Sequence, residues 1–121
     1  MRLFALRGAT TVTENDADAI LAATEELMRA VLERNALSPQ DCVSCLFTLT
    51  DDLDAVFPAL AARRIGFHAV PLLHAREIPV PGSLPRVIRV LVHYHAGEDH
   101  RPEHVYLHEA RQLRTDLDSA Q

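Results

Sequence analysis

The sequence predicts an α/β (α+β) fold in which a mixed β-sheet carries helices on one face. Strand-like and helix-like segments alternate in the first half of the chain, and three further strand-like segments follow. Residues 1–121 have the length of a single domain, and a chain of this size buries roughly two-thirds of its unfolded surface. A sheet covered on one face only leaves a face or an edge open, so oligomerisation is also expected.

The first half of the chain is expected to form a strand, a long helix and a short cap. RLFALRGATTV ends in β-branched residues and predicts a strand, with Gly8 at a bulge or bend. Apolar residues then repeat at helical spacing from Asp16 to Asn35, and Asn15 and Asp16 are candidate N-caps. LSPQD predicts a capped turn with Pro39 in its first turn.

The second half is expected to hold one or two short helices and several strands. Pro58 is expected to interrupt the helical segment, and Gly66 to end it. The expected elements are the buried strand CVSCLFTLT, the helical DDLDAVFPALAARRIG, the extended HAVPLLHAREI, the loop PVPGSLP, the strand RVIRVLVHYH, the short strand VYLHEA and a flexible polar tail at 111–121.

Composition excludes several classes of protein. The net charge of −5 argues against a general nucleic-acid binder. No apolar run approaches the about 18 residues of a membrane span, and no secretion signal is recognised, so a cytoplasmic chain with reduced Cys42 and Cys45 is expected. All 12 basic residues are arginine, which is typical of genomic base composition, so each arginine needs its own argument.

Arg89 stands in the middle of the apolar strand RVIRVLV. On a strand it shares one face with Val87 and Leu91, while the intervening residues point to the other face. A guanidinium keeps its charge at any ordinary pH, and burying it unpaired is expensive. Arg89 therefore faces solvent, pairs with an internal carboxylate or binds an anionic ligand.

Three further residues are polar or charged side chains within apolar segments. Arg7 ends an apolar strand beside a glycine, and Glu77 is the one acid in an apolar neighbourhood. Glu77 either pairs with Arg89 or accepts a hydrogen bond from a ligand hydroxyl. Tyr106 is either a core residue with its hydroxyl at the edge or a neutral donor to a carboxylate.

Metal and covalent chemistry find little support in the sequence. The seven histidines, with His93 and His95 on one strand face, show no recognised zinc spacing. The Cys42/Cys45 pair lacks a companion pair and does not open a helix. We therefore expect no metal and no cofactor, and a site that holds a small hydroxyl-bearing polyanion and stabilises charge.

Four blocks follow one another along the chain: LRGATTV, DLDAVFPALAARRIG, VPLLHAREIPVPGSLPRVIRVLV and HVYLHEARQLRTDL. In this order they resemble the monofunctional chorismate mutases of the small trimeric α/β, or Bacillus-type, class. The resemblance implies a homotrimer with a pseudo α/β-barrel core and active sites between subunits. It also implies conversion of chorismate to prephenate in the biosynthesis of Phe and Tyr, a pericyclic shift without a covalent intermediate.

The resemblance also implies roles for individual residues. Arg89 would contact the ether oxygen of the breaking bond, Glu77 the ring hydroxyl, and Arg7 a carboxylate with help from Tyr106. Where this chain has His74 and Leu60, the best-known members carry cysteine and lysine. The remaining substrate-binding residues implied are Phe57, Ala59, Arg63, Leu72, Leu73, His74, Ala75, Arg76, Leu113 and Arg114.

Two other functions fit the same residue types. Small trimeric α/β enzymes that hydrolyse enamines and imines also hold a carboxylate with an interface arginine. A non-catalytic sensor of a small carboxylate metabolite would use the same pocket. The Glu77–Arg89 pair together with Arg7 favours an ether-bearing dianion, and so the mutase.

Overall fold

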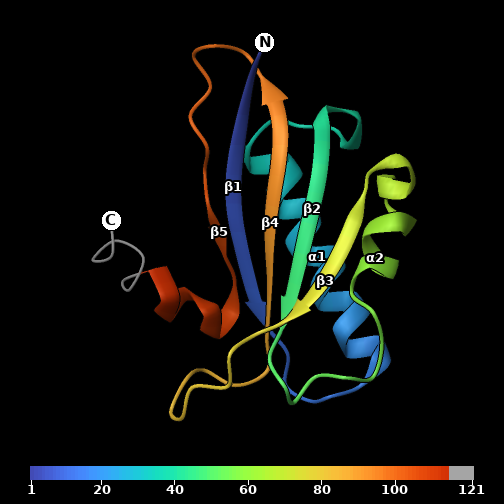
Figure 1. Cartoon of the computed structure of the whole chain (residues 1–121), viewed down its shortest axis with the longest axis vertical. Coiled ribbons are helices and arrows are strands. Elements are labelled where there is room, and N and C mark those ends of the chain that lie inside the picture. The colour runs from blue at the N-terminus through green and yellow to red at the C-terminus, as the bar shows by residue number, and fades with distance from the viewer. Residues whose placement is uncertain (115–121) are drawn as a thin grey trace.

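The structure, a computed structural model, describes residues 1–114 and forms a five-stranded mixed sheet with the order β3-β2-β4-β1-β5 (Figure 1). β4 pairs antiparallel with β1 and β2, and the two edge strands pair parallel with their neighbours. The predicted mixed sheet is confirmed. Its elements are β1 (Arg2–Thr11), α1 (Ala17–Arg34), β2 (Cys42–Leu49), α2 (Ala59–Arg64), β3 (Leu72–Arg76), β4 (Val87–Ala96) and β5 (Val105–Tyr106).

The long helix predicted from the apolar repeat is α1, and it lies behind the sheet in Figure 1. The Asp16 side chain caps it by accepting a hydrogen bond from the Ala19 amide at 3.0 Å. Asn35 ends it, and its side-chain oxygen accepts from the Glu103 amide at 2.8 Å, which ties the helix end to the chain before β5. The fully buried apolar side chains of α1 are Ile20, Leu27, Met28 and Val31.

Gly8 does not form the expected bulge or bend. It lies in an unbroken stretch of β1, opposite Val90 on β4. A Cβ atom at Gly8 would lie 3.2 Å from Leu27 Cδ1 and 3.2 Å from Val90 Cγ1. Glycine is therefore needed here because α1 packs closely against the strand, and the irregularity of the sheet lies instead between Cys42 and Ser44 of β2.

Three further expectations need correction. Pro58 precedes α2 instead of interrupting a helix, although Gly66, at φ 115°, does end the helical segment as predicted. The expected extended segment begins with a 3-10 turn at Phe67–Ala69. The last strand is only two residues long, and a 3-10 turn at His108–Arg111 follows it. Residues 112–114 are helical, and residues 115–121 of the predicted tail lie outside the described residues.

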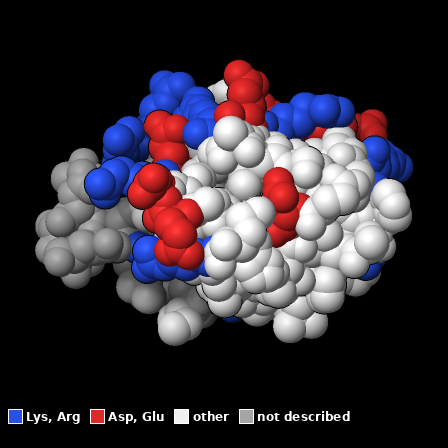
Figure 2. Space-filling view, turned by 90° about the horizontal axis from the view of Figure 1, so that it is seen from above, with Lys and Arg blue, Asp and Glu red and all other residues white. Residues whose placement is uncertain are grey.

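The two faces of the sheet differ in character. Val90 and Val92 are buried against the helices, whereas Arg89 and Leu91 are half-exposed on the opposite, open face. Val87, expected beside them, is fully buried at the start of β4. Seen from above, charges of both signs intermix along one side, and a broad part of the visible surface carries none (Figure 2). In residues 1–114 no helix is both long and apolar enough to span a bilayer.

β5 is joined to β1 through a histidine. The Arg7 amide donates a hydrogen bond to Nδ1 of His104 at 2.9 Å, just before the Gly8–Val105 pairing. Burial, and secondly the charge of Arg7, lower the pKa of His104. The neutral ring is the form that accepts this bond, because protonation would place a donor at Nδ1.

Replacing Thr10 with valine is expected to stabilise the protein. Thr10 is fully buried, and its hydroxyl has no hydrogen-bond partner within residues 1–114. An unpaired buried hydroxyl costs about 1–3 kcal/mol, and each kcal/mol recovered in a domain of this size raises the melting temperature by about 4 °C. Thermal unfolding followed by circular dichroism measures the gain.

Thr24→Val is the matched control for Thr10→Val. Thr24 is equally buried, but its hydroxyl donates to the Ile20 carbonyl at 2.7 Å. Its removal is expected to give no gain. A Thr10→Val protein that melts below the wild type would contradict the expectation.

Stability is expected to fall in mildly acidic solution because of His104. Its folded pKa is lowered, so the unfolded chain binds the proton first as pH falls. The contribution is fully present above the unfolded pKa of about 6.5 and is lost as pH falls from there through the folded pKa. Melting temperatures measured from about pH 7 to about pH 5 should show the loss.

The variant His104→Asn isolates the contribution of this ring. Asparagine keeps an acceptor near the position of Nδ1 but does not titrate. The variant should therefore lose less stability than the wild type over the same pH interval. Equal pH dependence in the two proteins would show that His104 is not the titrating group.

Candidate active site

A groove of about 800 Å³ lies on the open face of the sheet. Arg7, Arg89, Tyr106 and Leu113 line it, together with the loop 82–85. Four residues proposed from the sequence thus meet at one surface, although Arg7 and Leu113 lie far apart along the chain. They meet because β1 lies between β4 and β5.

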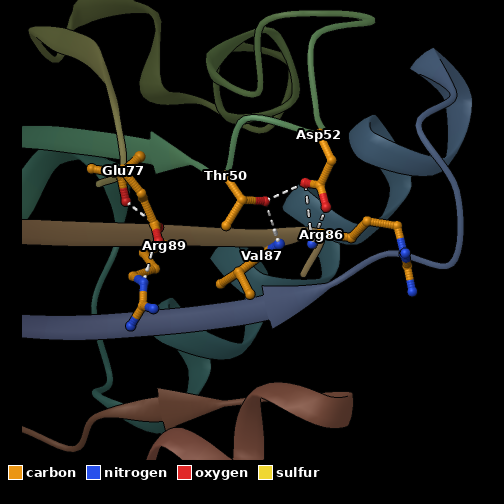
Figure 3. Close-up of polar contacts among 7 residues, drawn as sticks. Thr50, Asp52, Glu77, Arg86, Val87 and Arg89 are labelled. Atoms are coloured by element: carbon orange, nitrogen blue, oxygen red, sulfur yellow. Dashed lines mark hydrogen bonds and ion pairs between the residues drawn. The ribbon is translucent and has the colours of Figure 1, made fainter. Parts of the chain in front are cut away.

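Arg89 and Glu77 form an ion pair, with 2.9 Å between Nε and Oε2 (Figure 3). The Glu77 amide donates to the Leu49 carbonyl at 3.0 Å, so Glu77 extends the pairing of β3 with β2 by one residue. The Glu77 side chain is 14% exposed and that of Arg89 is 42% exposed. Arg89 is therefore paired with an internal carboxylate and also borders the groove. The contact uses Nε, so the terminal nitrogens of the guanidinium are not used by Glu77.

The start of β4 is held by a second group of polar contacts (Figure 3). The Asp52 carboxylate accepts from the Arg86 amide at 3.0 and 3.2 Å and from the Thr50 hydroxyl at 2.5 Å. The Thr50 hydroxyl in turn accepts from the Val87 amide at 3.0 Å. These contacts fix the first residues of the strand, and with them the register that places Arg89.

A second hollow, of about 530 Å³, lies at the β3 edge and is lined by Phe57, His74, Ala75 and Arg76, among others. His74 Nε2 accepts a hydrogen bond from the Ala59 amide at 3.2 Å, and its ring lies 5.1 Å from that of Phe57. Burial, and secondly the charge of Arg63, lower the pKa of His74, which favours the neutral, accepting ring.

The remaining proposed residues occupy varied positions. Arg76 donates from Nη1 to the carbonyls of Thr50 and Leu53, at 2.9 and 2.6 Å, and so holds the turn before α2. Ala59 is fully buried and Leu72 is half-buried. Exposed residues outside the lining of both hollows are Arg63, Leu73 and Arg114. The sequence-derived residues thus do not gather at one hollow of a single chain: some line the groove, some line the second hollow and the rest line neither. Their binding roles remain predictions.

Sequence reasoning missed Thr48, which lines the groove and lies directly opposite Arg89. Its hydroxyl donates to Glu77 Oε2 at 2.8 Å. Alternation along CVSCLFTLT does place Ser44, Leu46 and Thr48 on one face. The pairing of β2 with β4, which brings Thr48 to Arg89, joins distant segments and leaves no local signal.

Residues 3–117 match the family model of chorismate mutase type I. The chain is 54% identical to chorismate mutase AroH of Thermus thermophilus, over 96% of this chain and 97% of that protein. It is 39% identical to chorismate mutase AroH of Bacillus subtilis, over 97% and 94% of the two chains. A solved chorismate mutase from Clostridium thermocellum superposes with a TM-score of 0.88 at 47% identity, over 91% of this chain and 99% of that one. Matches of this extent show that the chain belongs to the chorismate mutase type I family.

Proposed function

We propose that this chorismate mutase rearranges chorismate to prephenate in the groove on the open face of the sheet. The observation that carries the proposal is the Arg89–Glu77 pair, a fixed cation at the groove beside a carboxylate. Chorismate carries two carboxylates, an ether oxygen and a ring hydroxyl. Two arginines, a glutamate and a tyrosine supply one partner for each kind of group.

In this proposal the four residues act at three parts of the substrate: a carboxylate, the ether oxygen and the ring with its hydroxyl. Arg7 and Tyr106 bind a carboxylate and hold the flexible side chain in its compact, reactive conformer. Arg89 faces the ether oxygen, where negative charge grows as the carbon–oxygen bond lengthens. Glu77 accepts a hydrogen bond from the ring hydroxyl and complements the positive charge that develops on the ring.

Catalysis then follows from charge that is already in place. A guanidinium fixed by Glu77 needs no reorganisation when the ether oxygen becomes negative, so it binds the transition state more tightly than the substrate. A pericyclic shift needs no nucleophile and no proton transfer. Lysine would serve poorly at this position, because it lacks the second edge of the guanidinium that reaches a ligand while Nε binds Glu77.

We also propose that the site is completed by a second copy of the chain, within a homotrimer. Of the residues expected to line one site, some border the groove of a single chain and others border its second, separate hollow. Phe57 and Leu73 are 71% and 68% exposed, and apolar residues this open favour burial against a partner. The neighbouring subunit would supply the group around Phe57 and His74.

The reaction belongs to aromatic amino-acid biosynthesis.

Cys42 and Cys45 are both free thiols in the structure. Free thiols persist in a reducing compartment, which supports our proposal that the enzyme works in the cytoplasm.

Arg89→Ala is expected to lower kcat by about two orders of magnitude or more. The lost charge acts in the transition state, where a preorganised group of this kind is worth about 3 kcal/mol or more. Loss of chorismate followed by ultraviolet absorbance measures the effect. Arg29→Ala, which removes an exposed arginine of α1, is the control and should leave turnover unchanged. Near-normal turnover of Arg89→Ala would remove Arg89 from the mechanism.

Mixed oligomers test whether the site is shared between subunits. Arg89→Ala removes the cation of one half-site, and Phe57→Glu places a charge in the other that repels the substrate carboxylates. If one site takes a half from each subunit, co-refolded mixtures should contain some intact sites and exceed the summed activity of the separate variants. Light scattering should give the mass of a trimer. Activity that never exceeds the sum would argue against shared sites.

A further inference from the structure

We propose that Thr48 is a positioning residue that acts through Glu77 on Arg89. Its hydroxyl and Arg89 Nε bind the same carboxylate oxygen, Oε2, which leaves Oε1 to receive the substrate hydroxyl. This inference rests on the proposed function, because it assigns Thr48 a task only if Arg89 and Glu77 act as described there.

The three side chains form one connected unit on neighbouring strands. Thr48 Oγ1 lies 2.8 Å from Glu77 Oε2, and Arg89 Nε lies 2.9 Å from the same atom. Thr48 and Arg89 face each other across the β2–β4 pair, so both backbones are fixed by the sheet. The Glu77 amide is held by the Leu49 carbonyl at 3.0 Å, which anchors the third member of the unit.

Two donors at one oxygen remove the freedom of the carboxylate. The terminal torsion of glutamate is broad, so a carboxylate held by one donor rotates and exchanges its oxygens easily. With the Thr48 hydroxyl and Arg89 Nε both on Oε2, the plane of the Glu77 carboxylate is set. No residue within 1–114 donates a hydrogen bond to Oε1. Oε1 is therefore the atom available to a ligand hydroxyl.

The same contacts orient Arg89. Because Nε is directed at Oε2, the orientation of the guanidinium plane depends on where that oxygen is held. In Figure 3 the rest of the guanidinium extends away from Glu77. Loss of the Thr48 hydroxyl would therefore disturb the Arg89 cation through Glu77.

Thr48→Val tests the proposal with little change of shape. Valine suits a half-buried strand position and keeps the branched side chain. We expect kcat to fall about tenfold, as for loss of a hydrogen bond to a charged group, with a smaller change in KM. Thr48→Ser retains the hydroxyl and should restore kcat to within about twofold of the wild type. Thr10→Val, the same substitution at the buried β1 position, should leave kcat unchanged.

A double-mutant cycle shows whether Thr48 acts through Glu77. Once Glu77→Ala has removed the carboxylate, Thr48→Val should cause no further loss, since the two side chains form one unit. Fully additive losses would overturn the positioning role. Melting curves confirm that the variants fold, and Thr48→Ala replaces Thr48→Val in the same cycle if the valine protein does not.

The outcomes separate this inference from the proposed function. Wild-type kcat in Thr48→Val, with Arg89→Ala inactive, would overturn the role of Thr48 and leave the mechanism intact. Failure of Thr48→Ser to restore kcat would also overturn it, because the hydroxyl would not be the group that matters. Normal turnover of Arg89→Ala would instead overturn the mechanism itself.

Discussion

The arrangement of the site depends on one permanent cation, Arg89, on the central strand β4. Arg89 cannot lose its charge, and a guanidinium among apolar strands needs a carboxylate close by. Glu77, the residue after β3, supplies this carboxylate. Thr48 lies on β2, the strand between β3 and β4, and its hydroxyl binds Glu77. The pair is only partly buried, so it costs some desolvation, gains a solvent-screened attraction and adds little net stability. Its use is to keep one charge in one place beside a groove.

Placing that charge also depends on contacts well away from it. Asp52 and Thr50 hold the amides of Arg86 and Val87, and so fix where β4 begins. Arg86 has a positive φ of 52°, which costs backbone energy in a residue with a side chain. The carboxylate of Asp52 offsets this cost, since it accepts the amide of that same residue. The segment around Asp52 thus fixes the start of β4, and the start of β4 fixes the position of Arg89 at the groove.

Sequence patterns predicted correctly those features that depend on residues close together in the chain. The helix α1 and its cap at Asp16 follow from side chains within a few residues of one another, and alternation put Arg89 and Leu91 on one face of their strand without deciding what that face meets. Gly8 and Thr48 were misread or missed because their neighbours, α1 and β4, come from distant parts of the chain. The division of the site residues between two hollows likewise depends on strand order, which no local pattern encodes. Resemblance to a family proposed the residues, and the structure showed which of them meet.

The order of the strands bears on how the chain folds during synthesis. β1 precedes the other four strands in the chain, pairs along its whole length with β4 and pairs at two residues with β5. Gly8 therefore gains its partners Val90 and Val105 only after those later segments have been made. Contacts of such long range slow folding, because a large loop must close before they form. The helix α1 needs no distant partner and is free to form early. On the ribosome, β1 remains without its partners until β4 and β5 have emerged, and in that interval its open edges could pair with a strand of another chain.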